Sequence, residues 1–114
     1  MHELSLVAEI LRLAEQHALE QRAMRIREIR LEVGVLSGVE PSLLKRAFEA
    51  LSTGSQAEGA ELIFEAKGLL LACKACQKET EAKELSMRCP NCGSLQTRVL
   101  AGEDVLLKTL VLEA

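Results

Sequence analysis

The chain has 114 residues, of which 48% are hydrophobic and 2% aromatic, with four cysteines and a formal net charge of −3. This length predicts one compact domain, or one domain with a small appendage, and no apolar run approaches the roughly 18–20 residues that span a bilayer. The acidic balance gives no overall attraction to nucleic acid or anionic lipid. The start Met1-His2-Glu3 lacks the basic region of a secretory signal, so we expect a cytoplasmic protein.

Helical and strand periodicities follow one another along the first part of the chain. Residues 4–22 carry an apolar face at helical spacing and consist largely of good helix formers. Residues 28–36 alternate strictly, which predicts a half-buried strand followed by a turn at 36–38. The buried face of this strand would consist of Ile29, Leu31, Val33 and Val35.

A second helix is expected at about 41–53. Pro41 fits its first turn, where the missing N–H would be unpaired in any case, and Gly54 is a C-terminal stop. Residues 60–66 then predict a second strand that turns Leu62 and Phe64 to the core. The apolar face of the helix would consist of Leu43, Leu44, Ala47, Phe48 and Leu51.

The last predicted strand covers about 104–112 and has an irregular pattern. Val105 and Leu107 share one face, whereas strict alternation puts Leu110 and Leu112 on the other. A bulge near Lys108-Thr109 would bring both pairs to one buried face. The alternative is a strand that is covered on both faces.

The four cysteines fall in a segment, 67–99, where apolar periodicity fades. Cys73-Lys74-Ala75-Cys76 and Cys89-Pro90-Asn91-Cys92 are separated by twelve residues. Two such knuckles point four thiolates at one centre, and a shell filled by four protein ligands is structural rather than catalytic. The segment has too few large apolar side chains to fold on burial alone, and zinc binding would supply about 10 kcal/mol or more.

Other interpretations of this segment remain open at the level of the residues. An iron centre of the rubredoxin type also uses four cysteines, and some zinc ribbons bind nucleic acid. A thioredoxin-type dithiol is not expected, because two pairs lie in a loop-rich segment. Basic residues outnumber acidic ones six to three between residues 67 and 99, an excess that a solvated surface explains.

The two histidines differ in what they suggest. The Met1 α-amine, the His2 backbone nitrogen and the His2 imidazole can close adjacent chelate rings around one ion, and Glu3 can complete four-coordination. Such a nitrogen-rich set suits Ni(II) or Cu(II), but a histidine at position 2 is a weak signal by itself. His17 is expected to be a packing residue at the edge of the helix's apolar face. No Ser-His-Asp or Cys-His arrangement is evident, so we do not expect an enzyme.

Several segments form a combined pattern. They are Met1-His2-Glu3-Leu4-Ser5, Arg30-Leu31-Glu32-Val33-Gly34 followed by Leu36-Ser37-Gly38-Val39-Glu40-Pro41, Ala57-Glu58-Gly59-Ala60-Glu61-Leu62, and the two CxxC knuckles. Together they resemble the HypA/HybF family of nickel metallochaperones for hydrogenase maturation, over essentially the whole chain. The resemblance implies an α/β (α+β) fold, in which a small three-stranded sheet and two helices carry an inserted zinc ribbon.

The resemblance also implies two metal sites. His2 would be the principal nickel ligand, with backbone nitrogens from Met1 and Glu3, and Glu40 is a further candidate. Residues 1–66 with the returning strand 103–114 would form the nickel-binding domain, and residues 67–102 the zinc ribbon. The zinc ligands would be Cys73, Cys76, Cys89 and Cys92.

The implied function is delivery of Ni(II) for maturation of the large subunit of a [NiFe]-hydrogenase, with urease served in some organisms. A maturation GTPase and the hydrogenase large subunit would be the partners. No nucleic acid or membrane partner is expected, and the oligomeric state stays open between monomer and homodimer. Two departures from the family pattern stand out: Gln77 replaces a glycine, which would strain the first knuckle, and the cysteine segment contains no histidine.

Overall fold

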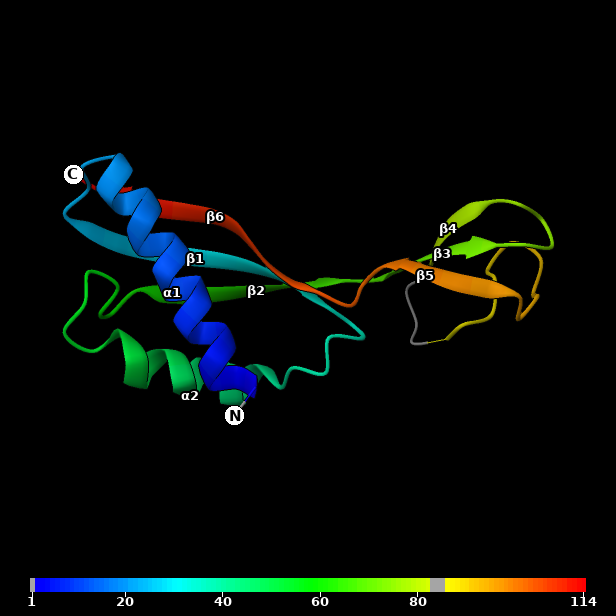
Figure 1. The fold of residues 1–114 in the computed structure, drawn as a ribbon, viewed down its shortest axis with the longest axis horizontal. Coiled ribbons are helices and arrows are strands. Elements are labelled where there is room, and N and C mark those ends of the chain that lie inside the picture. Colours follow the sequence, from blue (N-terminus) through cyan, green and yellow to red (C-terminus); the bar gives the residue numbers. More distant parts are fainter. Residues whose placement is uncertain (1, 83–85) are drawn as a thin grey trace. The chain divides into compact units, whose positions relative to one another are not determined.

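A computed structural model describes residues 2–82 and 86–114, apart from the side chain of His2. Within these residues the strands form two three-stranded sheets, with the orders β2-β1-β6 and β4-β3-β5. The elements in chain order are α1 (His2–Glu20), β1 (Arg25–Gly34), α2 (Pro41–Ser52), β2 (Glu61–Lys67), β3 (Leu69–Cys73), β4 (Glu79–Ala82), β5 (Thr97–Ala101) and β6 (Val105–Glu113) (Figure 1). The fold class expected from the sequence, two helices with a small sheet and a cysteine-bearing ribbon, is confirmed. None of the described helices combines the length and apolarity that a membrane crossing requires.

The chain divides into two compact units. Unit 1 comprises Met1–Leu31, Val39–Glu65 and Leu107–Ala114, and unit 2 comprises Glu32–Gly38 and Ala66–Leu106. Each unit is described separately below.

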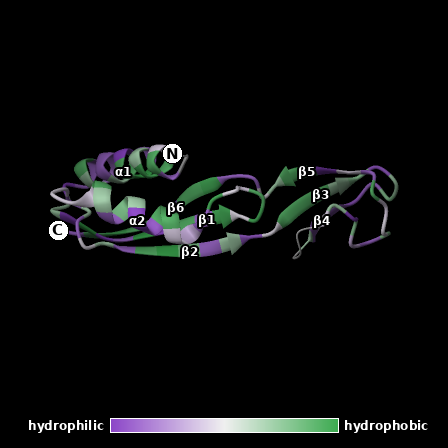
Figure 2. Ribbon diagram, turned by 90° about the horizontal axis from the view of Figure 1, so that it is seen from below, coloured by the Kyte–Doolittle hydropathy of each residue, from purple (hydrophilic) through white to green (hydrophobic). Residues whose placement is uncertain are grey.

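In unit 1 both helices lie on one side of the strands (Figures 1 and 2). The apolar face of α1 is the one that the periodicity predicts, and it packs on a narrower strip of α2. Leu43 and Leu51 of α2 are 46% and 42% exposed, so their expected burial is wrong. Leu43 is rotated by about 100° from the buried Leu44 on the helix, and Leu51 lies in the last turn. The buried helix residues are Val7, Ile10, Leu11, Ala14, Ala18, Leu44, Ala47 and Phe48.

β1 ends one residue before Val35, which differs from the expected strand. Ile29 and Leu31 are fully buried as predicted, but Val35 is 37% exposed and Gly34 is the buried residue. The cause is a contact between main chains within unit 2. A Cβ atom on Gly34 would lie 2.3 Å from the carbonyl oxygen of Gly102, and the Gly34 N–H donates to the Asp104 carbonyl at 2.9 Å. No side chain fits at this position.

β6 shows the phase change that the predicted bulge requires. Lys108 and Thr109 are both exposed, and the pattern is regular on either side of them. Leu106 and Val111 are 50% and 48% exposed, which contradicts the alternative of a strand covered on both faces. The half-buried residues are Val105, Leu107, Leu110 and Leu112.

The sheet of unit 2 was not expected from the sequence. β3 pairs antiparallel with β4 on one side and with β5 on the other. Its small core consists of Leu69, Leu71 and Ala82, with Val99 packed against them. The sheet brings the end of β3, where the first cysteine lies, next to the segment that leads into β5.

Candidate metal centre

The two cysteine knuckles have equivalent backbone geometry. In the first, the Cys73 N–H donates to the Lys78 carbonyl at 3.0 Å, and in the second the Cys89 N–H donates to the Ser94 carbonyl at 2.8 Å. Each bond spans five residues and closes a tight loop around its CxxC pair. Cys73 is the last residue of β3, so the sheet of unit 2 fixes where the first loop begins.

The four sulfur atoms converge on one point. The Sγ atoms of Cys73 and Cys92 are 3.6 Å apart, those of Cys76 and Cys89 are 3.8 Å apart, and all four lie within 4.8 Å of one another. A tetrahedral shell with Zn–S bonds of about 2.3 Å places its sulfurs about 3.8 Å apart. Disulfide bonds need about 2.05 Å, and all four cysteines are free. The donor set therefore fits a four-sulfur metal site.

The thiols of this cluster differ in their affinity for protons. Hydrogen bonds from the Asn91 side chain and the Lys78 backbone lower the pKa of Cys76 to about 6. The Ser94 backbone favours the thiolate of Cys92, but hydrogen bonding with Cys73, burial, and further hydrogen bonding with Cys89 and Cys76 outweigh it and raise the pKa of Cys92 to about 11. The cluster thus keeps protons at neutral pH that a metal ion must displace.

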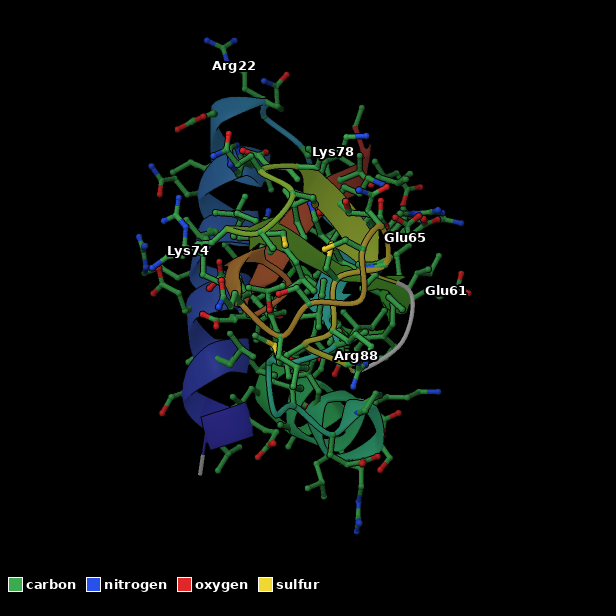
Figure 3. All side chains as sticks on the ribbon, turned by 90° about the vertical axis from the view of Figure 1, so that its right-hand side faces the viewer. Arg22, Glu61, Glu65, Lys74, Lys78 and Arg88 are labelled. Carbon is green, nitrogen blue, oxygen red and sulfur yellow. The ribbon has the colours of Figure 1, made fainter. Side chains whose placement is uncertain are left out.

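Three basic residues of unit 2 that the structure describes do not gather on one face. Lys74, Lys78 and Arg88 extend in different directions in Figure 3, and the Arg88 guanidinium donates to the Gly93 carbonyl at 2.8 Å. Acidic residues of the same unit balance them in number. The basic residues are Lys67, Lys74, Lys78, Lys83, Arg88 and Arg98, and the acidic ones are Glu32, Glu79, Glu81, Glu84, Glu103 and Asp104.

The expected nickel ligands are only partly within the described structure. Met1 and the side chain of His2 lie outside the described residues. The backbone of His2 and Glu3 forms the start of α1. Glu40 is the N-cap of α2, where its carboxylate accepts hydrogen bonds from the Ser42 N–H at 3.4 Å and the Ser42 hydroxyl at 3.0 Å. The assignment of these four residues to nickel stays a prediction.

The environment of His17 differs from the expected one. Its side chain is 57% exposed, and Nδ1 lies 3.9 Å from a Glu20 carboxylate oxygen. His17 precedes the fully buried Ala18, so it is rotated by about 100° away from the packed face of α1. Sequence reasoning also missed Asn91 as a hydrogen-bond donor to Cys76, although its place between the second pair of cysteines was a usable signal.

A family model described as "Hydrogenase/urease nickel incorporation, metallochaperone, hypA" matches residues 1–112. The chain belongs to the HypA family. It is 48% identical over 113 residues to the hydrogenase maturation factor HypA of Aquifex aeolicus (strain VF5), covering 99% of this chain and 98% of the relative. It is 36% identical over 114 residues to HypA of Campylobacter jejuni, covering 99% of this chain and 100% of the relative.

HypA proteins of known structure share the fold. The solution structure of the Ni metallochaperone HypA from Helicobacter pylori matches with a TM-score of 0.76 and 27% identity, covering 98% of this chain and 97% of that one. A second solution structure of a HypA protein matches with a TM-score of 0.75 and 28% identity over 98% and 96% of the two chains. These findings confirm the resemblance, and they do not favour a nucleic-acid-binding ribbon. The family is one of metallochaperones and maturation factors.

Proposed function

We propose that this chain delivers Ni(II) for maturation of the large subunit of a [NiFe]-hydrogenase. The observation that carries the proposal is the match to the HypA family model over residues 1–112. A cytoplasmic maturation GTPase and the hydrogenase large subunit would be its partners. The chain would act by binding and releasing nickel rather than by catalysis.

In this proposal nickel binds at the N-terminus. The His2 imidazole is the principal ligand, Met1 and Glu3 supply nitrogens, and Glu40 is a further candidate. The start of α1 at His2 supports this assignment, because the first four N–H groups of a helix have no intrahelical acceptor. The backbone nitrogen of His2 can therefore bind a metal without loss of a helical hydrogen bond, and the positive end of the helix dipole favours its deprotonated form.

The second metal in the proposal is a structural zinc ion. Cys73, Cys76, Cys89 and Cys92 would fill its tetrahedral shell, which leaves no open position for a substrate. The ion would hold the two knuckles of a ribbon domain at 67–102 together. Residues 1–66 and 103–114 would form the separate nickel-binding domain.

Nickel titration of the zinc-loaded protein tests the proposal. His2→Ala, and a variant with two residues added before Met1, should each lower nickel affinity by at least about 100-fold, because loss of an outer-shell partner alone costs 10- to 100-fold. Zinc content should not change. Affinity for nickel should also fall below about pH 6.5, where the imidazole is protonated.

His17→Ala is the matched control, since it removes the other histidine of the chain, which is exposed on the same helix. It should bind nickel as tightly as the parent protein. Unchanged nickel affinity in His2→Ala or in the extended variant would refute the N-terminal site. An equal loss in His17→Ala would place the nickel elsewhere.

A further inference from the structure

The four cysteines of the cluster differ in their exposure to solvent. Cys73 and Cys89 are buried, with 5% and 2% of their surface exposed, whereas Cys76 is half-buried and Cys92 is exposed. Each knuckle therefore has one accessible cysteine and one that is covered. Because oxidation of a cysteine requires access to its sulfur, Cys92 is the first member of the cluster that a small oxidant in solution would reach.

A partner for an oxidised Cys92 lies beside it. The Sγ atoms of Cys92 and Cys73 are 3.6 Å apart. In the second pair, the Sγ atoms of Cys76 and Cys89 are 3.8 Å apart. Each pair joins one knuckle to the other and combines an accessible cysteine with a buried one. Redox-active cysteines have this arrangement, in which an accessible thiolate reacts first and a neighbouring cysteine converts the product into a disulfide.

The sequence separation of the cysteines also favours bonds between the knuckles. Such bonds would join residues that are 19 and 13 positions apart, whereas a bond inside one knuckle joins residues only three positions apart. A cross-link that closes a longer loop removes more conformational entropy from the unfolded chain. The pairs Cys73–Cys92 and Cys76–Cys89 should therefore stabilise unit 2 more than two separate CxxC disulfides.

We propose that Cys92 is a site of oxidation by hydroperoxides, and that the product is a disulfide bond between Cys92 and Cys73. The Cys92 thiolate attacks one oxygen of the peroxide, so that an S–O bond forms, the O–O bond breaks and hydroxide leaves. The Cys73 thiolate then attacks the sulfur of this sulfenic acid, so that the S–S bond forms and a second hydroxide leaves. Each thiolate loses one electron, and the peroxide takes up both.

The same steps with a second peroxide join Cys76 to Cys89. Metal ions bind thiolates, so the first disulfide removes two ligands from the proposed zinc ion, and reduction returns them. The loss of zinc rests on the proposed structural ion. The disulfide itself rests on the exposure of Cys92 and on its distance from Cys73, and it is independent of the nickel site.

Peptide mapping of the full chain during treatment with hydrogen peroxide tests the proposal, because trypsin cleaves at Lys74, between the cysteines of the first knuckle. Free thiols are blocked with N-ethylmaleimide at each time point before digestion. The first disulfide should link peptide 68–74 to Cys92 of peptide 89–98, while Cys76 in peptide 75–78 carries the blocking group. It should form before the sulfoxide of Met24, which is 70% exposed and provides an internal reference.

Two variants compare the accessible cysteines. Cys92→Ser and Cys76→Ser each remove one ligand of the cluster, so they are matched in their effect on metal binding. Cys92→Ser should form its first disulfide at least about tenfold more slowly than Cys76→Ser, because it lacks the one exposed cysteine. Equal rates in the two variants overturn the proposal. A first disulfide inside either knuckle of the parent protein, or earlier oxidation of Met24, overturns it as well.

Zinc release separates this proposal from that of the structural ion. Formation of the first disulfide should transfer zinc to a chelating dye, and dithiothreitol should restore both the thiols and zinc binding. If the purified chain contains no zinc, the proposed structural ion is wrong, and the peptide map still decides the disulfide. A disulfide that forms while zinc stays bound would contradict the proposed loss of the metal.

Discussion

Gln77 and Gly93 occupy equivalent positions in the two knuckles, each directly after the second cysteine. Both have a left-handed backbone, with φ of 58° and 78°. Glycine adopts this conformation freely, whereas a residue with a Cβ pays about 1–2 kcal/mol. Gln77 thus occupies a strained turn, as the sequence suggests. The hydrogen bond from the Cys73 N–H to the Lys78 carbonyl nevertheless forms.

Gln77→Gly should relieve this strain. We expect the free energy of unfolding of the zinc-loaded protein to rise by about 1 kcal/mol, measured by urea titration. Gln96→Gly is the control, because Gln96 lies in the same unit without a positive φ, and it should lower stability slightly. A loss of stability in Gln77→Gly would mean that the glutamine side chain contributes more than the turn costs.

At the scale of elements, the N-cap of α2 coincides with a proposed nickel ligand. The Glu40 carboxylate accepts from the Ser42 N–H, one of the four that a helix start leaves unpaired. Pro41 occupies the first turn, and Gly54 follows the helix with a φ of 82°. A nickel ion that used Glu40 would compete with this cap.

Two substitutions at Glu40 separate the roles. Glu40→Asn keeps a good capping residue without the carboxylate, so stability should stay within about 0.5 kcal/mol while nickel affinity falls. Glu40→Ala should also lower the free energy of unfolding by about 1 kcal/mol. Thermal unfolding and nickel titration are the two readouts. If Glu40→Asn binds nickel like the parent protein, Glu40 is a cap only.

The elements differ in how well the sequence predicts them. α1 and β6 are long enough for their apolar periodicity to stand out, and the phase change at Lys108 is visible in the order of residues alone. β3 and β4 have five and four residues, and β4 reads Glu-Thr-Glu-Ala, so no pattern distinguishes them from loops.

The residues of the candidate metal sites also differ in how well the sequence predicts them. The spacing of the cysteines predicts that their sulfur atoms converge, because two CxxC loops direct four thiolates to one centre regardless of the surrounding fold. The place of Asn91 between Cys89 and Cys92 is visible in the sequence, but its hydrogen bond to Cys76 of the other knuckle depends on how the loop folds. The nickel ligands rest on family resemblance and stay a prediction.

At the scale of the whole molecule, the two units have separate sources of stability. Unit 1 buries large side chains from both helices and β1, whereas the core of unit 2 has Leu69, Leu71, Ala82 and Val99. Many small metal-binding domains with so little apolar core fold only when the metal is bound.

Removal of the proposed zinc ion by a strong chelator should therefore act on unit 2 alone. Amide hydrogen exchange should become fast in β3, β4 and β5, while the amides of α1 and α2 stay protected. Return of zinc should restore protection. The same loss of protection in both units would show that they unfold together.

Zinc binding should release protons at neutral pH. The pKa of Cys92 is raised to about 11, so its thiol is protonated at pH 7, while Cys76, with its pKa lowered to about 6, is mostly thiolate. Since zinc binds thiolates, its affinity should rise with pH above about 6 and fall more steeply below it, where Cys76 also takes a proton. Proton release on zinc addition in weakly buffered solution measures this, and an absence of release would contradict it.

The contact between Gly34 and Gly102 also bears on how such sequences diverge. Where two side chains pack, a larger residue at one position can be offset by a smaller residue at the other. At Gly34 the obstacle is a backbone carbonyl oxygen 2.3 Å from a hypothetical Cβ, and no substitution can make a carbonyl group smaller. A residue with a side chain can therefore replace Gly34 only if the backbone itself moves. If a related sequence has another residue at this position, its alignment should be checked again. If the alignment is correct, the backbone of that protein should follow a different path after β1.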